Sequence, residues 1–89
     1  MLPTHRVTTH PGKILLEEFL HPSGISQAEL ARRLRISANR LNEIVKEKRG
    51  ISAETALLLG AFFRTTPEFW MNLQVAYDLT RARARLRVA

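Results

Sequence analysis

Hydrophobic residues along most of the chain recur every three or four positions, which is the spacing of one face of an α-helix. Short polar turns divide this pattern into five helical segments. The residues that mark the starts of these segments are Pro11, Ser26, Ser37, Ser52 and Thr66. We therefore predict an all-α fold, a compact five-helix bundle.

The first segment begins after His10, where Pro11 suits the first helical position because an N–H would have no partner there. Its end is predicted at Pro22 and Gly24, with Gly24 as a left-handed cap. The side chains predicted to face the core are Leu15, Leu16, Phe19 and Leu20. Residues 1–9 show no periodicity and are expected to form a flexible arm.

Residues 26–46 contain two short helices joined by a tight turn. Ser26 and Glu29 match the capping box, in which the hydroxyl accepts from the amide of residue 29 and the carboxylate reaches back. Ser37 is the N-cap candidate of the second helix. The apolar stripes are Leu30, Ala31 and Leu34 in the first helix and Leu41, Ile44 and Val45 in the second.

The side of the second helix opposite its apolar stripe carries only polar residues, namely Asn39, Asn42, Glu43 and Lys46. Asn can bond adenine through two hydrogen bonds, Glu can accept from cytosine, and Lys can donate to guanine or phosphate. This face can therefore read base edges in a major groove. The alternative is an ordinary solvated face, since the exposed side of any surface helix is polar.

The spacing of the apolar positions favours the DNA-binding interpretation. Ile36, Leu41 and Ile44 follow Ala31 by five, ten and thirteen residues. These offsets resemble those of the lambda-repressor-like helix-turn-helix family, with Gln27 as the first residue of the pattern.

Basic residues flank the second helix on both sides. Arg35 occupies the turn position that is usually Gly, where a left-handed non-Gly residue costs about 1 kcal/mol. Either the turn geometry differs slightly or this strain is tolerated. We expect the charge of Arg35 to lie near a phosphate. Lys48 and Arg49 follow the helix and are expected to contact phosphate or to complement the helix dipole. Gly50 is the predicted left-handed stop.

The last two segments are richer in apolar residues. The segment after Ser52 is apolar on most sides, as expected of a helix at the centre of a bundle, and Gly60 inside it indicates either close packing or no special role. In the segment after Thr66, the face predicted to close the core contains Phe69, Leu73 and Ala76. The face predicted as a dimer or partner surface contains Trp70, Leu73 and Tyr77, unless the small core takes up all of them.

The net charge is +6, from 14 Lys and Arg against 8 acidic residues, and the basic residues concentrate in residues 32–49 and 81–87. Such clusters favour a polyanionic partner, with nucleic acid as the usual one. Residues 81–89 are expected to form a basic tail that frays, because Arg81 and Arg85 repel each other one turn apart.

Composition also narrows the function classes. The chain has no Cys, and His5, His10 and His21 are five and eleven residues apart, not the three or four that bring two ligands together on a helix, so we expect no metal and no cofactor. No apolar run is long enough for a signal peptide or a membrane span, and we expect a cytoplasmic protein without a membrane partner. Motifs for a catalytic nucleophile, a phosphate loop or paired carboxylates are missing, so an enzyme is not expected.

Four motifs together carry a more specific resemblance. They are His10-Pro11-Gly12, the central helix pair, Lys48-Arg49-Gly50-Ile51-Ser52, and Thr66-Pro67-Glu68-Phe69-Trp70-Met71-Asn72-Leu73-Gln74. Over about residues 10–79 the chain resembles the HigA-type antitoxins, also called the VapI group. The resemblance implies a five-helix homodimer that represses its own toxin–antitoxin operon through double-stranded operator DNA. It also implies binding of a RelE-like (HigB-type) toxin that cleaves messenger RNA.

Matched by position, the resemblance implies phosphate contacts by Ser26 and Gln27. Ala38 departs from the polar residue frequent at its position, and its methyl is expected to touch a thymine methyl. Arg40 is assigned to a base edge or to phosphate without a choice between them. The full base-reading prediction is Ser37, Ala38, Asn39, Arg40, Asn42, Glu43 and Lys46. The full phosphate prediction is Ser26, Gln27, Arg35, Lys48 and Arg49.

The leading hypothesis is a dimeric repressor that is also an antitoxin, with residues 10–80 as the DNA-binding domain and its dimerisation helix. One alternative is a stand-alone or phage-type transcriptional regulator with no toxin. Another is a toxin-binding inhibitor whose DNA binding is incidental.

Overall fold

Residues 9–86 are described by the computed structural model of the chain. The helices are α1 (Pro11–Ile14), η1 (Leu15–Leu20), α2 (His21–Ser23), α3 (Gln27–Leu34), α4 (Ala38–Val45), α5 (Ala53–Phe63) and α6 (Pro67–Leu86). Since α1, η1 and α2 follow one another without a gap, residues 11–23 form one helix with a wide π-helical turn in its middle. The described residues thus hold five helices and no strand, which confirms the all-α prediction.

Side chains cap the helices where the sequence predicts. The hydroxyl of Ser26 accepts from the amide of residue 29 at 3.0 Å, and that of Ser37 accepts from residue 40 at 3.0 Å. Ser52 and Thr66 accept in the same way at 3.2 and 3.1 Å. The reciprocal half of the predicted capping box is not formed, because the Glu29 carboxylate pairs instead with two arginines of its own helix, Arg32 and Arg33.

The first helix ends where the sequence predicts, with Pro22 in its last turn and Gly24 as its cap. Its middle turn is wide, since the amide of His21 bonds the carbonyl of Leu16 five residues back. Pro22 then lies inside the last turn, and the hydroxyl of Ser23 donates to the carbonyl of Phe19. The helix therefore ends one residue after Pro22, at the predicted stop. Gly24, with φ of 70°, is the predicted left-handed cap.

Arg35 and Gly50 both lie in predicted turns, but only Arg35 is left-handed. Arg35 has φ of 60° and closes α3 in the left-handed conformation, so of the two alternatives the tolerated strain is the correct one. Gly50 is not left-handed: the residue after α4 with positive φ is Glu47, at 63°. Gly50 is needed for space, because a Cβ there would lie 2.9 Å from the Oε1 of Gln74.

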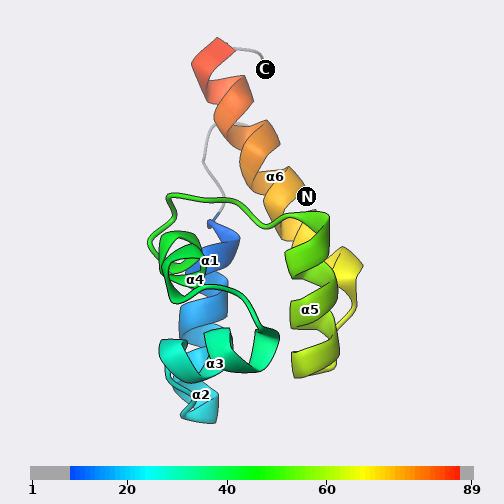
Figure 1. Cartoon of the computed structure of the whole chain (residues 1–89). Helices are drawn as coiled ribbons and strands as arrows, with labels where there is room; N and C mark the ends of the chain where they lie inside the picture. Colours follow the sequence, from blue (N-terminus) through cyan, green and yellow to red (C-terminus); the bar gives the residue numbers. More distant parts are fainter. Residues whose placement is uncertain (1–8, 87–89) are drawn as a thin grey trace.

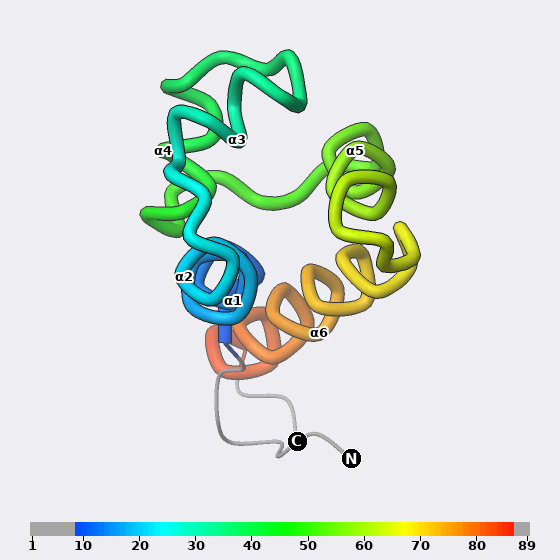
Figure 2. Tube along the Cα trace, turned by 90° about the horizontal axis from the view of Figure 1, so that it is seen from below, coloured from blue at the N-terminus to red at the C-terminus, as the bar shows by residue number. Residues whose placement is uncertain are grey.

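The helices enclose one apolar core. In Figures 1 and 2, α3 and α4 lie together beside the first helix, while α5 packs with the start of α6 and α6 then runs back past α1. Gly12 allows the close approach of α1 to α4, since a Cβ would lie 1.8 Å from the carbonyl oxygen of Ile44. The buried apolar residues are Leu15, Leu20, Leu30, Ala31, Leu34, Leu41, Ile44, Ile51, Ala56, Leu59 and Trp70.

Gly60 also has a packing reason. A Cβ at this position would lie 3.1 Å from the amide nitrogen of Pro67 and from the carbonyl oxygen of Thr65. The turn between α5 and α6 therefore folds directly against α5. Of the two alternatives left by the sequence, close packing is the correct one.

The orientation of α6 about its axis differs from the prediction. Trp70 is fully buried, and its indole Nε1 donates to the hydroxyl of Thr65 at 2.8 Å. Gln74 and Thr80 are also buried on this side, whereas Phe69 is 37% exposed. The assignment of Trp70 to a partner surface is therefore wrong, because this side chain fills the centre of the core.

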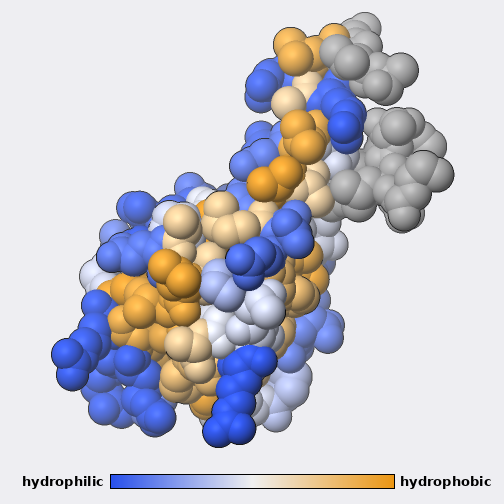
Figure 3. All heavy atoms as spheres, turned by 90° about the vertical axis from the view of Figure 1, so that its right-hand side faces the viewer, coloured by the Kyte–Doolittle hydropathy of each residue, from blue (hydrophilic) through white to orange (hydrophobic). Residues whose placement is uncertain are grey.

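The other two residues predicted for that surface, Leu73 and Tyr77, are half-buried. Tyr77 packs edge-on against His10, with 4.8 Å between ring centroids. Besides Phe69, the large apolar side chains that α6 leaves exposed are Val75, Leu79 and Leu86. Figure 3 shows hydrophobic atoms along the projecting part of α6 and over the side of the body formed by α5 and α6.

The predicted tail is part of α6 as far as the structure describes it. The helix continues through Arg81, Arg83 and Arg85 to Leu86, beyond the domain boundary expected at residue 80. The guanidinium of Arg81 lies over the ring of Tyr77, 5.5 Å from its centroid. The expected arm, residues 1–9, lies outside the described residues except for Thr9.

None of the helices in residues 9–86 has the length and hydrophobicity of a membrane span.

Candidate nucleic-acid interface

The α4 helix presents its polar side outward. Leu41 and Ile44 are fully buried against the core, so the opposite side of the helix faces solvent. The exposed residues predicted to read bases are Ser37, Ala38, Asn39 and Lys46, and the half-buried ones are Asn42 and Glu43. The structure thus brings these six side chains together on one accessible surface.

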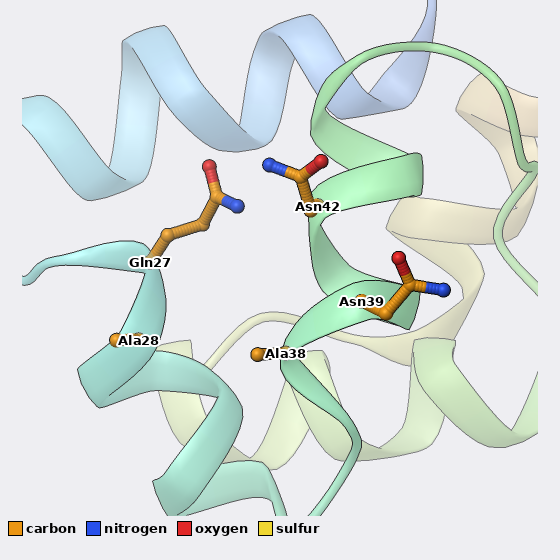
Figure 4. A pocket seen from close by; sticks show the side chains of 5 residues that line it. All are labelled: Gln27, Ala28, Ala38, Asn39 and Asn42. Atoms are coloured by element: carbon orange, nitrogen blue, oxygen red, sulfur yellow. The ribbon is translucent and has the colours of Figure 1, made fainter.

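A hollow of about 410 Å³ separates the starts of α3 and α4. Its lining residues are Gln27, Ala28, Ala38, Asn39 and Asn42. Figure 4 shows the amides of Gln27 and Asn42 turned toward each other across this hollow, with the methyls of Ala28 and Ala38 below them in the view. Amides can hydrogen-bond base edges and methyls can contact a thymine methyl, so the lining has the chemistry of a base-reading surface.

Arg40 is placed differently from the other residues of the predicted reading set. Its Nη2 donates to the hydroxyl of Thr55 at 2.9 Å, and lies 3.3 Å from Ser52 Oγ and 3.4 Å from Glu54 Oε1. The head group therefore braces α4 against the start of α5 instead of extending over the hollow. The sequence pattern of α4 does not indicate that Arg40 holds α5, because its partners lie 12 to 15 residues further along the chain.

The start of α3 offers a second polar element. Ser26 is exposed and Gln27 half-exposed at the N-terminal end of an eight-residue helix, where the dipole favours an anion. Arg35 is exposed at the other end of the same helix, in the turn before α4. A hydrogen bond from Arg32 lowers the pKa of the Glu29 carboxyl below its ordinary value.

The segment after α4, residues 46–50, is exposed throughout. Its fold is held by backbone bonds, among them Lys48 N to the carbonyl of Glu43 at 2.8 Å. Arg49 also pairs with the Glu43 carboxylate, with 2.8 Å between Nη2 and Oε1. Exposed ion pairs contribute little stability, so a phosphate can replace this carboxylate at small cost.

His10 is a buried polar residue whose role the sequence does not reveal. Nδ1 of His10 accepts from the amide of Gly12 at 2.8 Å and caps the first helix. Burial lowers the pKa of His10 below its ordinary value of 6.5, against the opposing charges of Glu47 and Asp78. Among residues 9–86 no three His, Cys, Asp or Glu side chains come together as metal ligands.

Comparison with known proteins adds the family. The helix-turn-helix family model matches residues 16–70. Virulence-associated protein I of Dichelobacter nodosus is 52% identical over 73 residues, which are 82% of this chain and 68% of that protein. Antitoxin HigA-1 of Vibrio cholerae is 35% identical over 85 residues, or 96% and 80% of the two chains.

A solved structure is similar over its fold as well as its sequence. It is the Pseudomonas aeruginosa antitoxin HigA with the higBA promoter, with 53% sequence identity and a TM-score of 0.85. The match covers 86% of this chain and 84% of that one.

Proposed function

The chain belongs to the helix-turn-helix family, in its group of HigA-type antitoxins, and on this premise we propose that two copies bind operator DNA and repress their own toxin–antitoxin operon. The observation that carries the proposal is the amide-lined hollow between α3 and α4, open on the exposed side of α4. The similar antitoxin HigA was solved with the higBA promoter, which supports DNA binding by this chain.

Within this proposal, α4 enters the major groove. Base edges are read by Ser37, Ala38, Asn39, Asn42, Glu43 and Lys46. Phosphates are contacted by Ser26, Gln27, Arg35, Lys48 and Arg49, which lie at the start of α3, in the turn between the two helices and after α4. Arg40 holds α4 at its angle to α5 through Thr55 and acts on DNA only through that placement.

The second copy docks on α6. Val75 and Leu79 are four residues apart and Leu86 follows seven later, so all three lie on one side of the helix, and they are 49%, 47% and 65% exposed. This stripe continues along the part of α6 that extends from the body (Figure 1). A symmetric pair would place two α4 helices on one face, with half-sites about 34 Å apart or a multiple of that.

Binding to a duplex selected from a randomised library tests the DNA-binding proposal. Affinity is expected to fall by about 10³ to 10⁵ between 50 and 200 mM salt if the dimer contacts six to ten phosphates. Asn42→Ala is expected to cost about 1–3 kcal/mol on the selected duplex and little on an unrelated one. Affinity without salt dependence would contradict the proposal.

We also propose that the chain neutralises a RelE-like (HigB-type) toxin encoded beside it, as the antitoxin names of its relatives suggest. Co-expression with the neighbouring small basic protein tests this, with co-purification and restored growth as the expected results. A chain with Asn39→Ala and Asn42→Ala separates the roles, because operator binding should be lost while neutralisation is retained. Growth arrest by the neighbouring protein in cells that also hold this chain in folded form would favour the stand-alone regulator.

A further inference from the structure

One hydrogen bond ties α6 to the segment that follows the reading helix. Oε1 of Gln74 accepts from the backbone amide of Ile51 at 2.7 Å, and the bond is buried. Gln74 is 8% exposed and Ile51 is 3% exposed. The two residues are 23 positions apart in sequence, so the contact joins separate parts of the fold.

The amide of Gln74 is held in one orientation. Its Nε2 donates to Oδ1 of Asp78 at 2.9 Å, one helical turn further along α6. An amide held by a carboxylate on its nitrogen side must present its oxygen on the other side, toward Ile51. The absence of a side chain at Gly50 completes the fit, because a Cβ there would lie 2.9 to 3.0 Å from all three amide atoms.

The same amide sets the far end of the exposed segment 46–50. At the near end, this segment is held by backbone bonds to the last turn of α4 and by the Arg49–Glu43 ion pair. Lys48, Arg49 and Gly50 line a hollow of about 150 Å³ together with Gln74 and Asp78. The direction in which the two basic side chains project therefore depends on both α4 and α6.

We propose that Gln74 is a positioning residue for DNA binding: by fixing Ile51, it holds Lys48 and Arg49 in the arrangement that contacts phosphate. This rests on the proposed function, since it assumes that the segment meets DNA. Gln74 itself does not touch the nucleic acid. It also makes phosphate contact sensitive to α6, the helix that carries the exposed stripe Val75, Leu79 and Leu86.

Three changes around this hydrogen-bonded amide test the proposal. Gln74→Leu removes both hydrogen bonds at similar volume. Gln74→Glu keeps an acceptor for Ile51 but sets a carboxylate against Asp78. Combining Gln74→Glu with Asp78→Asn restores a donor–acceptor pair with the direction reversed. Asn72→Leu, an exposed position of the same helix, is the matched control for a polar-to-apolar change.

The measurements are operator affinity, affinity for an unrelated duplex, and the salt dependence of both, on variants shown by circular dichroism to be folded at the assay temperature. Gln74→Leu is expected to weaken both affinities by the same factor, about tenfold. This is the loss of one charge-assisted hydrogen bond from Lys48 or Arg49 to a phosphate, which contributes about 1.5 kcal/mol. The slope of log affinity against log salt should fall by about 0.9 for each phosphate that the variant no longer neutralises. Gln74→Glu should behave similarly, while the double variant and Asn72→Leu should bind like the wild type.

Hydrogen exchange at the Ile51 amide reports the hydrogen bond directly, with faster exchange expected in Gln74→Leu than in the control. Folded variants with faster exchange but unchanged affinity and salt slope would overturn the positioning role while leaving the proposed function intact. A decrease in affinity confined to the operator, with the salt slope unchanged, would also overturn it, because that result marks a change in base reading. A wild-type chain that binds no duplex would instead overturn the proposed function, and the positioning role with it.

Discussion

The α3–α4 pair and the α5–α6 hairpin differ in what they show to solvent. The α3–α4 pair buries one narrow stripe on each helix and exposes amides, hydroxyls and two alanine methyls. The α5–α6 hairpin buries a tryptophan and a glutamine while leaving apolar residues such as Leu57 and Leu79 about half exposed or more. One region thus offers hydrogen bonds for a polar ligand, and the other offers apolar area for a protein.

The difference between the two regions shows for which helices the hydrophobic pattern of the sequence predicts the buried side. On a short amphipathic helix, the polar and apolar sides are distinct, and the buried side follows from the pattern. On a helix with apolar residues on several sides, the pattern admits several orientations. The hairpin can therefore be understood only together with the helices that cover it, and the following variants test this contrast.

Trp70→Ala should have the largest effect, a decrease of about 3–5 kcal/mol in the free energy of unfolding, since it empties the centre of the core and leaves Thr65 without its donor. Phe69→Ala, at the neighbouring exposed position, should cost about 1 kcal/mol. Urea unfolding of both variants measures the difference. Equal decreases in the free energy of unfolding would contradict the burial of Trp70 and favour the orientation of α6 predicted from the sequence.

Leu79→Glu should leave the fold intact and weaken self-association by about 30-fold, because a carboxylate would enter the proposed interface at a cost of about 2 kcal/mol. Sedimentation equilibrium measures the dissociation constant. Leu57→Glu is the matched control, since Leu57 is 60% exposed on α5 and lies outside the α6 stripe. Dissociation caused by the control instead would move the interface to α5.

Arg35→Gly should raise the free energy of unfolding by about 0.5–1 kcal/mol, because Gly adopts the left-handed conformation without strain but also frees the unfolded chain. If Arg35 contacts phosphate, operator affinity and its salt slope should both decrease. Thermal unfolding and a salt titration of binding measure the two effects. Stabilisation with unchanged binding would remove Arg35 from the phosphate set.

A smaller effect concerns His10, which caps α1 and packs against Tyr77 of α6. Because burial holds the pKa of His10 below 6.5, the unfolded chain takes up its proton at a higher pH than the folded chain. The contribution of His10 to stability should be complete above about pH 6.5 and should decrease as the pH falls through the folded-state pKa. Urea unfolding between pH 7.5 and 5 measures this decrease.

His10→Asn keeps a side-chain acceptor at the cap but removes the titrating group, so this part of the acid-side decrease should disappear. Carboxyl groups titrate at lower pH in both proteins, and the difference between them isolates His10. The same decrease in both proteins would show that His10 is not its source.

The sequence by itself determined the features that depend on near neighbours. The serine and threonine caps, the left-handed end at Gly24 and the buried stripe of α4 all follow from residues within one or two turns. Their physical causes are local, because a cap satisfies an amide three residues away and a stripe repeats with the helical period.

Only the tertiary structure decided the features that join distant segments. The burial of Trp70, the bracing of Arg40 on α5 and the bond from Ile51 to Gln74 all depend on which helices lie side by side. Gly50 shows the same limit: its lack of a side chain serves a glutamine 24 positions later and not the turn in which it lies. Contacts of this kind leave no periodic signal, since their spacing is set by the packing of the whole bundle.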